Sequence, residues 1–135
     1  MKRLIGAALT IGALLLLVLL AVPAFAHHSF AAEFDGTRCR EFTGTLTKVD
    51  WQNPHGYFFM DIKDADGSVH NWSFQTYAII TLKRAGIDRQ MFIENVGKPV
   101  WVRGCLARNG TEHKAAAGTL KFADGVLRQM GQLQD

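Results

Sequence analysis

Two adjacent histidines, His27 and His28, stand directly after an Ala-x-Ala sequence formed by Ala24 and Ala26. A signal peptidase accepts small residues at these two positions, so cleavage after Ala26 would expose His27 as a new terminus. Its free α-amine and imidazole, with the second imidazole of His28, form a nitrogen-rich ligand set of the kind that copper(II) prefers. His55, which we expect on a turn, is a candidate for a third imidazole.

The same histidines also have simpler interpretations. A terminal histidine pair can bind metals adventitiously, and an imidazole beside a proline can serve only to hydrogen-bond a turn. Glu33 and Asp35 are oxygen candidates for the same metal. His70 is expected to pack within a strand, and His113 is expected to face solvent in a loop. The sequence leaves open whether the metal site is physiological.

Residues 1–26 have the organisation of a secretory signal peptide. Lys2 and Arg3 form a positive segment, and an apolar run follows from Leu4 to Val22. Pro23 ends that run just before the Ala-x-Ala sequence, which indicates cleavage and export to the periplasm or the medium. The alternative is an uncleaved anchor, because the run approaches the roughly 20 residues that span a bilayer.

Charge and motif content restrict the functions that remain. The chain has 15 basic and 12 acidic residues, and removal of Lys2 and Arg3 leaves 13 and 12, a net charge of +1. So small a charge disfavours nucleic acid as a partner. The sequence contains no G-x-S-x-G, H-E-x-x-H, C-x-x-C or phosphate-binding glycine loop. An enzyme is therefore a weaker interpretation than a binding protein.

The mature chain predicts one small β-rich domain. Residues 27–38 are expected to form an extended arm, and Thr76 is expected to cap a short helix that runs to Ala85. Residues 87–96 are expected to form a connection without regular structure. Apolar alternation and turn residues predict six strands, with a bulge near residues 47–48 where the inward phase of the first strand changes. The strands are expected at 39–51, 57–63, 69–75, 100–107, 115–122 and 126–130.

The order of these elements indicates the fold class. Three strands, one helix and two or three further strands match an OB-fold-like Greek-key barrel of five to six strands. The long, bent first strand is typical of small barrels. We therefore predict a barrel domain over residues 39–131, with a small sandwich or another open barrel as the alternative.

Aromatic residues at outward positions are candidates for a ligand-binding face. Tyr57, Phe59 and Trp101 have the outward phase, and OB-folds bind ligands across the sheet. Trp51 and Asn53 lie at the nearby turn and complete the candidate face. The alternatives are that the N-terminal arm covers this face, and that Trp51 and Asn53 only anchor the bent strand and its turn.

Cys39 and Cys105 are candidates for a disulfide. In an OB-like barrel the first and fourth strands pair antiparallel, and both cysteines have the phase opposite to Phe42 and Val102. An even number of cysteines in an oxidising compartment favours a bridge. Two buried thiols are the alternative.

Several sequence blocks form a recognisable pattern along the mature chain. They are 26–35, 43–55, Asp66-Gly67, Trp72-Ser73-Phe74, Gly104 and 107–110, of which His27-His28-Ser29-Phe30 and Trp51-x-Asn53-Pro54-His55 are the most specific. Together they resemble one family of small exported bacterial proteins, the domain of unknown function 6152 (DUF6152). The resemblance implies export and a single β-barrel-like domain over the mature chain, but no activity. Gln75 departs from it at a position where an acidic residue is expected, and neither cysteine belongs to the shared pattern.

Two hypotheses follow. The first is an exported, non-enzymatic binding module for a small molecule or an envelope protein, with no nucleic-acid partner and no membrane attachment after cleavage. The second is a copper-binding accessory protein that uses His27, His28 and His55.

Overall fold

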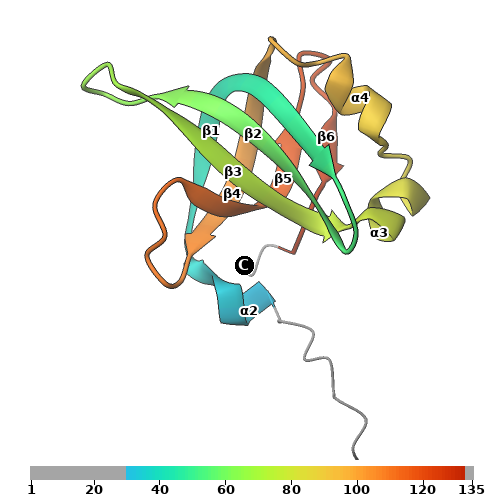
Figure 1. Cartoon of the computed structure of the whole chain (residues 1–135), viewed down its shortest axis with the longest axis horizontal. Coiled ribbons are helices and arrows are strands. Elements are labelled where there is room, and N and C mark those ends of the chain that lie inside the picture. The colour runs from blue at the N-terminus through green and yellow to red at the C-terminus, as the bar shows by residue number, and fades with distance from the viewer. Residues whose placement is uncertain (1–29, 133–135) are drawn as a thin grey trace, which may run out of the picture.

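Six strands and three short helices make up the described part of the chain, residues 30–132 of a computed structural model (Figure 1). Residues 1–29 and 133–135 lie outside it. The helices are α2 (Phe30–Glu33), α3 (Ile79–Arg84) and α4 (Arg89–Ile93). The strands are β1 (Phe34–Trp51), β2 (His55–Lys63), β3 (Val69–Ala78), β4 (Pro99–Ala107), β5 (Lys114–Lys121) and β6 (Leu127–Gln129).

The strands close into a five-stranded ring. The hydrogen-bonded order is β3-β2-β1-β4-β5-β6, and a parallel pairing of β3 with β5 joins the two ends of the first five strands. The other pairings are antiparallel, and β6 extends β5. With a helix between β3 and β4, this connectivity confirms the predicted OB-fold-like Greek-key barrel and excludes a two-sheet sandwich.

Strand β1 holds the ring together because it pairs on both sides. Its first part, up to Thr45, pairs with β4, and its last part, from Thr45 to Trp51, pairs with β2. The register with β2 shifts between Leu46 and Lys48, which confirms the predicted bulge. The extra residue bends the strand, so that β1 curves around the barrel (Figure 1).

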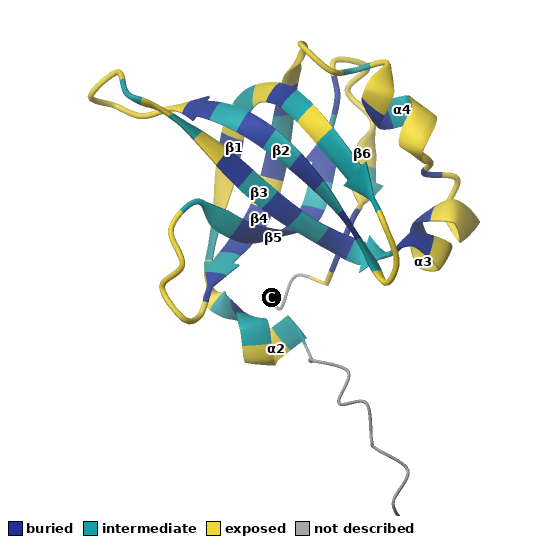
Figure 2. Ribbon diagram, in the orientation of Figure 1, coloured by how far each residue is buried: buried dark blue, intermediate teal, exposed yellow. Residues whose placement is uncertain are grey.

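Apolar side chains fill the barrel interior. Buried and more exposed residues alternate along β2 and β3, as Figure 2 shows. Phe58 stacks on Phe74 with ring centroids 5.1 Å apart, and both side chains are fully buried. Phe92 of α4 lies 5.5 Å from Phe58 and closes one end of this core. No helix within residues 30–132 is long and apolar enough to cross a membrane.

Three local predictions were wrong. Residues 30–33 are helical and β1 begins at Phe34, which pairs with Ala107, so the chain is not an extended arm up to residue 38. Residues 87–96 contain helix α4, because the Asp88 carboxylate accepts the Met91 N–H and the helix buries Phe92. Thr76 is not a helix cap but a buried residue of β3.

Tertiary pairing explains the position of Thr76. Strand β3 continues to Ala78, which pairs with His55 of β2, so the backbone at Thr76 is already engaged in the sheet. The Thr76 hydroxyl lies within hydrogen-bonding distance of the carbonyl oxygens of Gly56 (3.1 Å) and Tyr77 (2.9 Å). Helix α3 then begins at Ile79 without a side-chain cap.

The cysteine pair lies in the seam between β1 and β4. Cys39 and Cys105 are directly opposite in the register of the two strands, and their sulfur atoms are at disulfide distance. Cys105 is fully buried. The predicted bridge is therefore confirmed as a structural link between two strands, and it joins cysteines that are 66 residues apart in the sequence.

We expect removal of this disulfide to lower the free energy of unfolding by about 4 kcal/mol, the value for closing a loop of this length in the chain-entropy model. The test compares urea unfolding of the oxidised protein with that of the Cys39→Ala/Cys105→Ala variant. A reducing agent should destabilise the parent but leave the variant unchanged. Equal unfolding midpoints for the oxidised parent and the variant would contradict the prediction.

Candidate functional site

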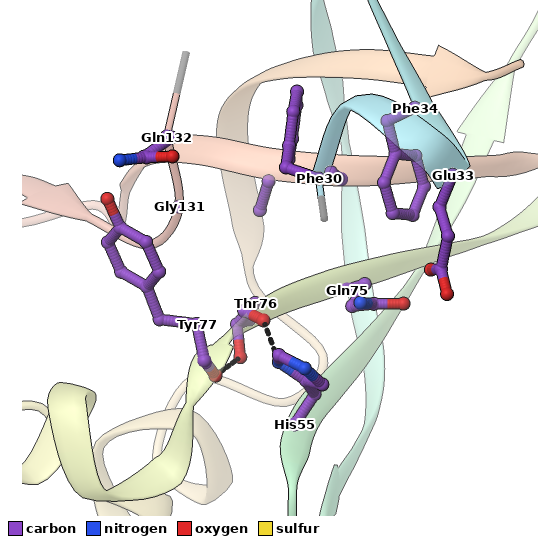
Figure 3. Close-up of a pocket in the computed structure, with 11 residues that line it drawn as sticks. Phe30, Glu33, Phe34, His55, Gln75, Thr76, Tyr77, Gly131 and Gln132 are labelled. Atoms are coloured by element: carbon purple, nitrogen blue, oxygen red, sulfur yellow. Dashed lines mark hydrogen bonds between the residues drawn. The ribbon is translucent and has the colours of Figure 1, made fainter. Parts of the chain in front are cut away.

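A cavity of about 200 Å³ lies between helix α2 and the outer wall of the barrel (Figure 3). Its lining combines aromatic, small and polar side chains from segments that are far apart in the sequence. The lining residues are Phe30, Glu33, Phe34, His55, Gln75, Thr76, Tyr77, Ala116, Ala117, Gly131 and Gln132.

Helix α2 forms the roof of this cavity, although a single helical turn has little stability of its own. The Arg108 guanidinium holds it in place, since Nε donates to the carbonyl oxygen of Ala31 (2.9 Å) and Nη2 to that of Phe34 (3.5 Å). The Arg108 backbone N–H also donates to the Glu33 carbonyl oxygen (2.9 Å). Phe34 is almost completely buried, and Phe30 packs against it at 5.6 Å.

Small residues leave the space that the cavity occupies. Ala116 and Ala117 line this part of the wall on β5, and neither has a side chain larger than a methyl group; Ala117 also belongs to the core cluster. Gly131 passes close to β5, where a Cβ atom would collide with the carbonyl oxygen of Ala117. The Gly131 N–H donates to the Gly118 carbonyl oxygen at 3.1 Å, which keeps the C-terminal segment against the wall.

His55 has a defined tautomer at this site. Its Nδ1 lies 3.0 Å from the carbonyl oxygen of Thr76. A carbonyl oxygen can only accept a hydrogen bond, so in the neutral ring Nδ1 carries the proton and Nε2 keeps an unshared electron pair. His55 therefore contributes a hydrogen-bond acceptor, or a metal ligand, to the lining.

Gln75 and Tyr57 form a second hydrogen-bonded pair at the cavity. The Tyr57 hydroxyl donates to Gln75 Oε1 at 2.8 Å. Burial raises the pKa of Tyr57, and the nearby Glu33 carboxylate raises it further, so the phenol remains a protonated donor. Among the described residues, the half-buried Glu33 carboxylate has no ion pair and no hydrogen-bond partner. The described residues therefore bring one negative charge to the cavity without a paired cation among them.

The structure separates the residues of the predicted ligand face. Tyr57 adjoins the cavity through Gln75, but Trp51 packs on Phe92 at 5.6 Å against the core. Asn53 is exposed in the turn between β1 and β2. Phe59 lies under the Lys48 ammonium and Trp101 under that of Lys121, each at 5.2 Å. No recorded contact joins Phe59 to Trp101.

The predicted metal ligands are only partly placed. His55 lines the cavity, whereas His27 and His28 lie outside the described residues. Within residues 30–132, no three His, Cys, Asp or Glu side chains converge in a way that could hold a metal ion. Asp35 accepts hydrogen bonds from Thr37, which lower its pKa, and it does not line the cavity.

A second, more open hollow lies beside the loop between β4 and β5. His70 and His113 stack there with ring centroids 4.3 Å apart, and Trp72 meets the His113 ring edge-on at 5.2 Å. His70 therefore packs as predicted. His113 lies in the loop as predicted and is half-buried, because its ring contacts those of His70 and Trp72.

Sequence reasoning found the chemistry of Glu33 and His55 but not their surroundings. Phe30 and Tyr77 carried no signal that distinguished them from ordinary apolar residues. The run of alanines in β5 was a usable signal, because a wall of methyl groups leaves room beside the barrel. Gln75 was noted only as a departure from a family pattern.

The structure is therefore a small OB-type β-barrel that has a pocket on its outer surface. The chain belongs to the family of unknown function DUF6152, whose model matches residues 14–116. This match confirms the resemblance drawn from the histidine and Trp-x-Asn-Pro-His blocks. No match was found among curated proteins, and none among solved structures.

Replacement of Arg108 by alanine should release helix α2 from the barrel, because two backbone carbonyl groups lose their side-chain donor. We expect faster amide hydrogen exchange at residues 31–34 than in the parent protein. Arg103→Ala is the matched control, since Arg103 is exposed on β4 and no hydrogen bond or ion pair is recorded for its side chain. Unchanged exchange in the Arg108→Ala variant would show that other contacts hold α2.

Proposed function

We propose that this protein is an exported, non-enzymatic binding module that holds a small molecule in the cavity beneath α2. The cavity itself is the observation that carries the proposal. It combines a largely apolar lining with a few converging polar groups, the usual composition of small-ligand sites. Its volume of about 200 Å³ is below the ~300–1,000 Å³ of drug-sized ligand sites, so the ligand is small.

Binding accounts for the lining better than catalysis does. The Thr76 hydroxyl faces two backbone carbonyl oxygens, and the protonated nitrogen of His55 faces a third. Neither group is paired as a nucleophile with a general base. Cys39 and Cys105 are paired with one another, so neither offers a free thiol as a nucleophile.

Export is proposed from the sequence of residues 1–26, with the periplasm or the medium as the destination. The cysteine pair at disulfide distance supports this location, because such bridges persist in oxidising compartments. An envelope protein remains the alternative partner to a small molecule.

Filling the cavity should abolish binding. We expect Ala116→Leu to remove the chemical-shift changes that small fragments, screened by NMR, produce at Glu33, His55 and Tyr77. Ala123→Leu adds the same volume at an exposed turn residue and should leave binding unchanged. Fragment binding that persists in Ala116→Leu, or that maps to another surface, would contradict the proposal.

Copper(II) binding is the second candidate function, and the hydrogen bond of His55 favours it. Metal-ligating histidines commonly donate their second ring N–H to a backbone carbonyl, as His55 does to Thr76. Phe30, which lines the same cavity, follows His28 by only two residues, so the chain length allows the His27-His28 pair to reach His55.

The copper candidate is tested on protein whose intact mass shows a start at His27. We expect electron paramagnetic resonance of the Cu(II) form to show nitrogen hyperfine structure that His27→Ala/His28→Ala removes and His55→Gln reduces. His113→Gln serves as the control, since His113 lies in the other hollow. A spectrum that none of these substitutions alters would exclude a site built from these residues.

A further inference from the structure

We infer that the cavity beneath α2 selects small organic cations, that is, ammonium compounds with a compact apolar or hydroxyl-bearing part. This inference rests on the proposed binding function and names the chemical class of its ligand. It follows from the charge, the aromatic walls and the hydrogen-bonding groups of the cavity, which are considered in turn.

The charge of the lining is negative. Among the described residues that line the cavity, Glu33 is the only Asp, Glu, Lys or Arg, and His55 uses its Nδ1 for the hydrogen bond to Thr76. The Glu33 carboxylate is half-buried and has no partner among the described residues. Because charge interactions strengthen away from bulk water, this carboxylate favours a cation and opposes an anion.

The nearest basic side chains do not neutralise that charge by contact. The Arg108 guanidinium donates to the carbonyl oxygens of Ala31 and Phe34 on the roof helix. The Lys114 ammonium lies 5.7 Å from the centroid of the Phe34 ring. Neither side chain lines the cavity, so a ligand inside it would meet Glu33 first.

Aromatic rings supply the apolar walls. Phe30, Phe34 and Tyr77 border the space, and Figure 3 shows the Glu33 and Gln75 side chains on the same side of it. Ring faces attract ammonium groups, and the half-buried rings of Phe30 and Tyr77 are the ones that a ligand can contact, since Phe34 is 1% exposed. A carboxylate combined with aromatic walls is the arrangement that binds organic ammonium ions rather than hydrated metal cations.

The hydrogen-bonding groups add a preference for a hydroxyl. Because the Tyr57 hydroxyl occupies Gln75 Oε1, the amide NH₂ of Gln75 is the group left to donate, and no partner is recorded for it among the described residues. A ligand oxygen near the ammonium group can accept from it. Choline and ethanolamine have this combination and suit a cavity of about 200 Å³.

The test measures binding of choline and of 3,3-dimethylbutan-1-ol, its neutral counterpart of the same shape, by isothermal titration calorimetry with the exported chain. We expect choline to bind at least tenfold more tightly than the alcohol. Glu33→Gln should remove this difference. Glu112→Gln is the charge-matched control, because Glu112 lies in the other hollow and is exposed.

The outcomes separate this inference from the proposed function. Equal binding of both compounds that Ala116→Leu abolishes would overturn cation selection and leave a small-molecule cavity. Choline binding that responds to Glu112→Gln and not to Glu33→Gln would also overturn it, because the site would be elsewhere. If neither compound binds and no fragment perturbs the cavity residues, both the inference and the proposed function fail.

Discussion

The pairing of β1 with two different partners is the constraint on which the rest of this structure depends. One strand supplies hydrogen bonds to β4 along its first part and to β2 along its last part, and its bend brings the two halves of the barrel together. Gly44 lies at the transition, where a Cβ atom would collide with the carbonyl oxygen of Asp61. The disulfide of Cys39 and Cys105 fixes the β4 side of the same strand.

A closed and filled barrel forces any ligand site to its exterior. Leu46, Met60 and Phe74 are fully buried inside the ring, so the interior has no room for a ligand. The cavity lies instead between helix α2 and the alanines of β5. The hydrogen bond from Arg108 to Ala31 holds α2 in this position. The cavity therefore has a wall of small β5 residues and a one-turn roof helix that the Arg108 side chain holds in place.

The two candidate functions use the same atom of the same histidine. Because Nδ1 of His55 bonds the Thr76 carbonyl oxygen, Nε2 is the atom left to accept a hydrogen bond from an ammonium group or to coordinate a metal. The two functions differ in the groups that act together with His55. An organic cation would use the Glu33 carboxylate and the aromatic walls, whereas copper would use the histidine pair of residues 27–28. The described residues contain the first set in full and only one member of the second.

Apolar alternation with a period of two was enough to predict the strands and the bulge in β1, because both are local patterns. The order of these elements then indicated the barrel, and the strand pairing of such a barrel brought Cys39 and Cys105 together. The one-turn helix α2 and the five-residue α4 are too short to show a helical period, and pairing with β2 rather than local capping decided the place of Thr76. The sequence also identified Glu33 and His55 as residues able to do chemistry. Only the tertiary structure joined them to Gln75, Tyr77 and Gly131, because strand register and the path of the C-terminal segment set those distances.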